Sequence, residues 1–207
     1  MKPSPTRVQY GSYNDAFDYF NHELFAGTLS ACLLSFSRKA RAAGFFSAER
    51  WSSRDGQETM HEISLNPDLL ARPPIEIMGT LVHEMVHLWQ QEHGTPSRST
   101  YHNVEWADKM EQVGLMPSDS GQPGGKRTGQ RMTYYVIIDG PFQRAFEAMP
   151  AEHLLPWISG QPLGGVRTSP GRRDKVPYEC PGCRSKVWGR AGLELNCTPC
   201  GHGFVRQ

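Results

Sequence analysis

The chain has no long apolar run. Hydrophobic residues make up 38% of its 207 residues, and no stretch approaches the roughly 20 consecutive apolar residues that a membrane-spanning helix needs. We therefore expect no membrane partner. The chain also lacks the charged-then-apolar start of a secretory signal peptide, which predicts a cytoplasmic location.

Cysteine is scarce, and four of the five cysteines lie in two CxxC pairs. Disulfides are disfavoured in a reducing cytosol, whereas four thiolates at this spacing are typical of a closed, tetrahedral, structural zinc site. The sequence therefore predicts a zinc ribbon that folds only with its metal. Its expected ligands are Cys180, Cys183, Cys197 and Cys200.

An excess of charge of one sign is also missing, since the net charge is +1, but the charges are unevenly distributed. Residues 1–115 carry ten Lys/Arg and fourteen Asp/Glu, whereas residues 166–207 carry eight and three. Basic and aromatic side chains together can contact phosphates and stack on bases, although such a charge run is often only a solvated face. The residues predicted to contact DNA are Arg184, Lys186, Trp188 and Arg190.

A five-residue run with metal-binding chemistry, HEMVH, contains His83, Glu84 and His87. It lies in residues 73–94, which begin with two prolines, repeat apolar residues at helical spacing and end at a glycine, and so predict one helix. Four residues along a helix turn about 400°, so both imidazoles project from one face and can bind one zinc ion. A core helix with two incidental histidines is disfavoured, because buried imidazoles and carboxylates need partners.

A catalytic zinc needs a third protein ligand. Residues 99–114 predict a second helix, starting at its Ser-Thr pair, with His102 on the apolar side, and this position favours His102. Two alternatives stay open. His93 would lie about 240° round the first helix from the second histidine, and Glu105 offers a carboxylate.

Glu84 is the predicted catalytic group. Zinc lowers the pKa of a bound water to about 7, and the neighbouring carboxylate can accept its proton and pass it to a leaving amine. The pattern therefore predicts a zinc-dependent hydrolase of peptide bonds, with a protein or peptide as substrate.

Three further motifs occur in order within residues 13–116. They are F-x-G-x-L at 25–29, I-x-L-N at 63–66 and HNVEW at 102–106, and the second and third flank the HEMVH helix. This arrangement resembles the SprT-like family of zinc metallopeptidases, which usually has glycine where this chain has Asn103.

The resemblance implies an α+β fold, with a zincin-like core of helices and a small mixed sheet and a small C-terminal four-cysteine zinc ribbon. It also implies one catalytic zinc held by three histidines and one structural zinc. The best-known eukaryotic members of the family cleave proteins crosslinked to DNA, and the resemblance implies that this is a possible activity of the chain.

The chain is predicted to divide into four parts. A polar, glycine-rich loop at 117–131 is expected to be a flap or a linker, followed by a strand at 131–139 and a helix at 142–155. The parts are residues 1–116 as the catalytic domain, 117–158 as an extension packed on it, 159–175 as a linker and 176–207 as the ribbon.

Three expectations concern the surroundings of the site. Gly79, one turn before the first histidine, is expected to let the second helix approach closely. Substrate is expected to pair with an edge strand that contains residues 62–65. Tyr134 or Tyr135 could donate a hydrogen bond to the developing oxyanion, although aromatic residues in such a strand are more often structural.

A second class of function stays open, a non-catalytic zinc-binding regulator whose ribbon binds nucleic acid or a partner protein. A closed structural site needs four protein ligands and has no use for Glu84. A fourth ligand from Glu105 or His93 would favour this hypothesis.

Overall fold

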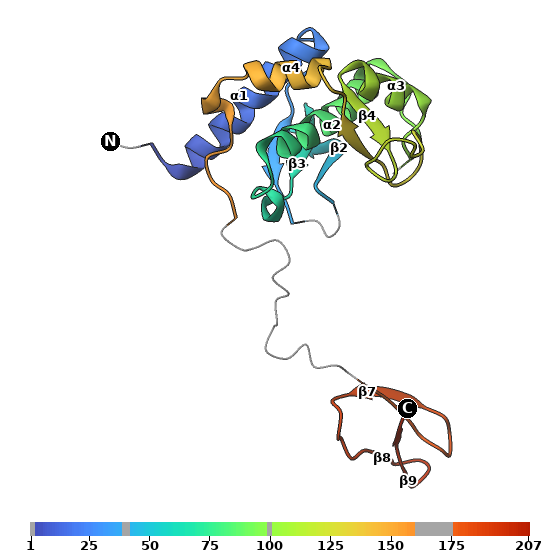
Figure 1. Cartoon of the computed structure of the whole chain (residues 1–207). Helices are drawn as coiled ribbons and strands as arrows, with labels where there is room; N and C mark the ends of the chain where they lie inside the picture. Colours follow the sequence, from blue (N-terminus) through green and yellow to red (C-terminus); the bar gives the residue numbers. More distant parts are fainter. Residues whose placement is uncertain (1–2, 39–41, 99–100, 160–175) are drawn as a thin grey trace. The chain divides into compact units, whose positions relative to one another are not determined.

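The computed structural model describes residues 3–38, 42–98, 101–159 and 176–207. The chain divides into two units, Met1–Leu163 and Gly164–Gln207, which we treat separately (Figure 1). Helices with small sheets form the first unit and short strands form the second, which confirms the predicted α+β class. Apart from Ser159, the predicted linker lies outside the described residues. No described helix is both long and apolar enough to cross a membrane.

The first unit follows a mixed order of helices and strands. Its elements are α1 (Pro5–Phe25), β1 (Leu33–Phe36), β2 (Gly44–Ser52), β3 (Thr59–Leu65), the 3-10 turn η1 (Pro67–Leu69), α2 (Pro74–His93), α3 (Val104–Gln112), β4 (Leu115–Ser118), β5 (Thr133–Val136), α4 (Pro141–Ala148) and η2 (Ala151–His153).

The main sheet has the strand order β1-β3-β2. β3 runs parallel to β1 and antiparallel to β2, and its Ile63 and Leu65 are almost completely buried. The prediction that substrate pairs with residues 62–65 is therefore wrong, because both backbone edges of β3 are already paired. β1 and β2 are the edge strands.

Helix α2 passes through the core of the first unit, as Figure 1 shows, with β2 and β3 beside it. It begins after Pro73 and ends before Gly94, as predicted from these start and stop signals. Leu81, Val82 and Met85 are fully buried, and each such side chain contributes about 1.5–3 kcal/mol through the hydrophobic effect. The helix that carries HEMVH is thus rigidly held by packing.

Helix α3 begins later than its sequence predicts. The predicted start at residues 99–100 lies outside the described residues, and it is wrong because the helix begins at Val104 with Asn103 as its N-cap. The Asn103 carboxamide oxygen accepts a hydrogen bond from the Trp106 backbone N–H at 3.0 Å, which is the usual N-cap geometry. His102 consequently lies just before the helix.

The extension is shorter and more broken than expected. The predicted strand at 131–139 is observed as β5, which pairs with β4 in an antiparallel ladder. The predicted helix at 142–155 ends at Ala148, because Pro150 follows and proline cannot continue a helix; η2 comes after it.

The second unit consists of five short strands among its described residues. Three of them form a sheet in the order β10-β6-β7, and the other two pair with each other. They are β6 (Val176–Glu179), β7 (Lys186–Gly189), β8 (Asn196–Cys197), β9 (His202–Gly203) and β10 (Val205–Arg206).

Candidate metal sites and cleft

Three histidines meet on one side of α2. His83 and His87 come from adjacent turns of the helix, and His102 from the segment before α3. One nitrogen of each ring lies within 4.8 Å of the others, and the Nε2 atoms of His87 and His102 are 3.2 Å apart. Two ligands of a tetrahedral zinc with Zn–N bonds of about 2.05 Å are separated by about 3.3 Å. The triad can therefore hold a metal ion, and its geometry fits zinc.

Burial keeps these imidazoles neutral. It lowers the pKa of His83 well below the usual value, with further contributions from His87 and His102. It also lowers the pKa of His87 to about 3 and, less strongly, the pKa of His102. Zinc binds the neutral form of histidine, so the donors are in the right protonation state at neutral pH.

A hydrogen bond on the ring nitrogen that faces away from the triad fixes the orientation of His102. Its Nδ1 lies 3.0 Å from the Gly129 carbonyl oxygen, which can only accept, so Nδ1 carries the proton and donates. The lone pair is then on Nε2, the atom that faces His87. Hydrogen bonds of this kind set the tautomer and direction of histidine ligands.

Neither alternative third ligand reaches the triad. The His93 ring lies 3.2 Å from the Thr28 carbonyl oxygen, which places it on another side of α2. The Glu105 carboxylate accepts hydrogen bonds from the Gln90 side chain and the Thr95 backbone, both at 2.7 Å. Of the three candidates considered for the third position, the structure brings only His102 to the other two histidines.

Trp106 packs against all three imidazoles. Its ring centroid lies 4.3 Å from that of His102, 5.0 Å from that of His83 and 5.4 Å from that of His87. The indole is fully buried, so it limits the rotamers that the three rings can adopt.

Glu84 lies beside the histidines and is 6% exposed. β2 passes close to it at Gly44, where a Cβ atom would come within 3.1 Å of Glu84 Oε1 and 2.9 Å of the Ser64 carbonyl oxygen. Glycine therefore allows the edge strand to approach the carboxylate closely. The carboxylate of Glu84, the predicted base, therefore lies next to the edge strand of the sheet.

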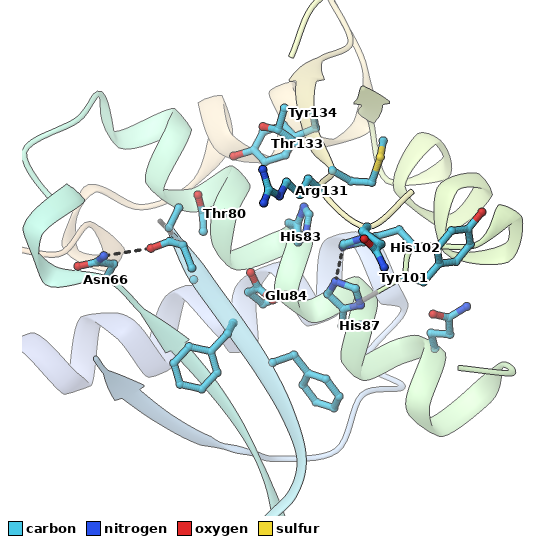
Figure 2. Close-up of a pocket in the computed structure, with 18 of the residues that line it drawn as sticks. Asn66, Thr80, His83, Glu84, His87, Tyr101, His102, Arg131, Thr133 and Tyr134 are labelled. Carbon is cyan, nitrogen blue, oxygen red and sulfur yellow. Dashed lines mark hydrogen bonds between the residues drawn. The ribbon is translucent and has the colours of Figure 1, made fainter. Parts of the chain in front are cut away.

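A cleft of about 1520 Å³ opens over these residues. One wall is the edge strand β2 with the segment before it, and the opposite wall is the segment that leads into β5 together with β5 itself. Figure 2 shows His83, His87 and His102 facing one another, with Arg131 and Tyr134 above them. Residues from the two walls of the cleft are Gly44, Phe45, Phe46, Ser47, Ala48, Arg131, Met132, Thr133, Tyr134 and Tyr135.

Tyr134, and not the second helix, covers Gly79. A Cβ atom at Gly79 would lie 2.5 Å from the Tyr134 hydroxyl, so the expectation that Gly79 accommodates α3 is wrong. The Tyr134 hydroxyl donates to the Glu76 carbonyl at 3.0 Å, and burial raises the pKa of this tyrosine to about 12. Tyr134 therefore holds the cleft wall against α2.

The four cysteines of the second unit also converge. Their sulfur atoms lie within 4.8 Å of one another, and Cys183 and Cys197 are 3.7 Å apart. A tetrahedral zinc with Zn–S bonds of about 2.3 Å separates two sulfur ligands by about 3.8 Å. The cluster can hold a metal ion and is consistent with a zinc ribbon.

The predicted nucleic-acid contacts lie on the surface of this unit. Trp188 is 61% exposed, and Arg184, Lys186 and Arg190 are exposed as well. The Lys186 ammonium pairs with the Glu179 carboxylate at 3.3 Å.

Sequence reasoning missed the residues that support the triad. The buried Gln90 side chain donates to Asn103 at 2.8 Å and also to Glu105, which ties α2 to the start of α3. Gly129 accepts from His102 across 27 positions of sequence. The sequence offered two signals, a polar Gln90 on an apolar helix and a glycine, Gly129, in a loop. Neither signal reveals which residue is the hydrogen-bond partner.

Comparison with known proteins gives two findings. The family model described as SprT-like matches residues 13–125, more than half of the chain. The chain is also 36% identical over 59 residues to a Salmonella typhimurium protein described as "Uncharacterized protein in mucB 3'region". The aligned stretch is 28% of this chain and 80% of that protein.

Proposed function

Because the chain belongs to the SprT-like family, we propose that it is a zinc-dependent endopeptidase whose catalytic base is Glu84. The observation that carries this proposal is the convergence of three imidazoles beside a glutamate in a cleft bordered by an edge strand. Three protein ligands leave one tetrahedral position open, as in catalytic zinc sites.

His83, His87 and His102 would hold the zinc. When bound, the ion would polarise the scissile carbonyl and make water acidic enough to be deprotonated near neutral pH. Glu84 accepts a proton from the attacking water and returns it to the departing amine. Trp106 and the Gly129 carbonyl keep the imidazoles in place.

The edge strand β2 would bind the substrate main chain. An extended peptide can add to an exposed edge through backbone hydrogen bonds, which read little of the side-chain sequence. Substrate selection then has to come from somewhere other than the cleft, and the second unit is the candidate.

We propose that this unit, as a zinc ribbon, recruits the enzyme to DNA-associated or DNA-crosslinked proteins. The support is an exposed indole close in sequence to exposed basic side chains: Trp188 with Arg184, Lys186 and Arg190. Each base stacked on an aromatic ring contributes about 1–3 kcal/mol, and the basic groups contact phosphates.

The regulator hypothesis loses its main support. A fourth protein ligand from Glu105 or His93 would have favoured it, and both side chains make hydrogen bonds elsewhere. A purely structural site would also make no catalytic use of Glu84.

The test is cleavage of an unstructured protein such as casein by the zinc-loaded chain and by Glu84→Gln, with and without single-stranded DNA. Removal of the base should lower the rate at least about 100-fold while both zinc ions remain bound. Equal activity of the two proteins would refute the assignment of Glu84. Inactivity of both, with two zinc ions bound, would favour the regulator.

Recruitment is tested by Trp188→Ala, with Val205→Ala as the matched control because Val205 is also apolar and 54% exposed in the same unit. Only the tryptophan variant should lose stimulation by DNA. Equal stimulation of wild type and Trp188→Ala would remove this part of the proposal.

A further inference from the structure

The glycine-rich loop between β4 and β5 is fastened to the candidate metal site. We call residues 119–129 of this loop the strap. We infer that the strap positions the third ligand, His102, and thereby sets the zinc affinity of the triad. The bound zinc in turn holds the strap in place. This inference rests on the proposed zinc site.

The strap meets His102 through three hydrogen bonds at one residue. The His102 backbone N–H donates to the Gly129 carbonyl at 2.8 Å, and the Gly129 N–H donates back to the His102 carbonyl at 3.1 Å. The imidazole Nδ1 donates to the same Gly129 oxygen at 3.0 Å. Backbone and side chain of His102 are thus both fixed by one glycine.

Glycine is suited to this position by its backbone. Gly129 has φ +154°, a value that residues with side chains rarely adopt, although a Cβ there would meet only the Met132 sulfur at 3.4 Å. Replacement by alanine therefore disturbs the peptide that holds His102 more than it disturbs the packing.

A second fastening lies two residues earlier. The Arg127 guanidinium donates to Asp108 at 2.9 Å and to Glu111 at 2.7 Å, and both carboxylates are on α3, the helix that follows His102. Arg127 is the strap's ion-pair anchor among the described residues. The strap is therefore bound both to His102 and to the helix that follows it.

The strap is also closed on itself. The Asp119 N–H donates to the Lys126 carbonyl at 3.1 Å, and the Lys126 N–H donates to the Asp119 carboxylate at 2.9 Å. The fully buried Ser118 hydroxyl, just before the strap, donates to the Gln122 carbonyl at 2.7 Å. These hydrogen bonds hold the strap in one closed conformation, as expected of a support for His102 and not of a flap that opens freely.

Two consequences follow from this arrangement. A residue that orients a metal ligand typically changes metal affinity about 10–100-fold when it is altered. Because coupling between two equilibria is reciprocal, zinc binding must also stabilise the closed strap. Arg127 and Gly129 are positioning residues, and neither lines the cleft.

The experiment measures the affinity of each zinc in the full chain by competition with a chelator. Gly129→Ala should weaken the triad zinc about 10–100-fold. Its matched control is Gly124→Ala, because Gly124 also has positive φ (+87°) but a Cβ atom there would have no neighbour within 4 Å. The ribbon zinc is the internal reference and should be unchanged in both variants.

Arg127→Gln tests the anchor without altering the backbone. Exposed ion pairs contribute little each, so we expect the triad zinc to weaken only about two- to fivefold. Lys126→Gln removes the neighbouring positive charge, whose described hydrogen bonds are made by its backbone, and should leave the affinity unchanged.

Limited trypsin digestion gives a readout that does not depend on any variant folding. Removal of zinc from the wild-type chain should produce cleavage after Lys126 and Arg127, and addition of zinc should suppress it. Identical digestion with and without the triad zinc would overturn the reciprocal coupling.

The outcomes separate the strap from the proposed function. A triad zinc weakened in Gly129→Ala but not in Gly124→Ala supports the inference. Equal affinity in wild type and Gly129→Ala overturns it while leaving the peptidase intact, and equal weakening in both glycine variants overturns it in favour of general loop strain. A wild-type chain that binds only the ribbon zinc refutes both proposals together.

Discussion

Alanine at position 79 should destabilise this protein, although alanine is normally better than glycine in a helix interior by about 1 kcal/mol. Gly79 is buried on α2, and a Cβ there would lie 2.5 Å from the Tyr134 hydroxyl and 2.9 Å from two ring carbons. The ring must move, which breaks the hydrogen bond from Tyr134 to the Glu76 carbonyl. Overpacking of this kind costs about 1–3 kcal/mol.

Taking about 2 kcal/mol for overpacking against about 1 kcal/mol gained in propensity, we expect Gly79→Ala to lower the free energy of unfolding by about 1 kcal/mol. Gly11→Ala is the matched control. Gly11 also lies inside a helix, α1, but a Cβ atom at this position would have no neighbour within 4 Å. This substitution should raise the free energy of unfolding by about 0.5–1 kcal/mol.

The assay is urea denaturation of the zinc-loaded chain, followed by far-ultraviolet circular dichroism, with an unchanged slope as the sign that only stability has changed. Equal stabilisation by the two alanines would refute the role given to Tyr134. In a Tyr134→Ala background the penalty at position 79 should disappear, because the clashing group is gone.

Three further predictions concern the metal sites and their support. After dialysis, metal analysis should find one zinc in His102→Ala and two in His93→Ala, and the reverse result would restore His93 as the ligand. Cys197→Ser should lose the ribbon zinc and keep the triad zinc, whereas loss of both would show that the two sites depend on each other. Glu105→Ala should keep two zinc ions but lower the free energy of unfolding by about 1–3 kcal/mol, because the buried Gln90 amide loses an acceptor; loss of the triad zinc would instead identify Glu105 as a ligand.

Much of the site could be predicted because its signals are local. HEMVH lies in a helix whose start, stop and apolar period are all written within about 20 residues, and α2 begins and ends where they predict. The two CxxC pairs are equally local, and their sulfur atoms converge as expected. Local periodicity and ligand spacing need no knowledge of tertiary contacts.

The rest depends on contacts that sequence spacing does not encode. Ser99, Thr100 and Asn103 are all residue types that cap helix N-termini well, so the sequence alone does not choose between them. The pairing of His102 with Gly129 keeps the chain extended up to Asn103, which is the observed N-cap. The order of strands made β3 central and left β2 beside the cleft. The partner of Gly79 comes from β5, more than 50 positions away along the chain.

The most direct test of the central claim is mass spectrometry of a protein substrate incubated with the zinc-loaded chain in ¹⁸O-labelled water. We predict new internal peptide termini, each new carboxylate carrying ¹⁸O, with wild type and not with zinc-loaded Glu84→Gln. The same labelled termini in both reactions, or none with wild type when both zinc ions are bound, would contradict a peptidase that uses Glu84 as its base.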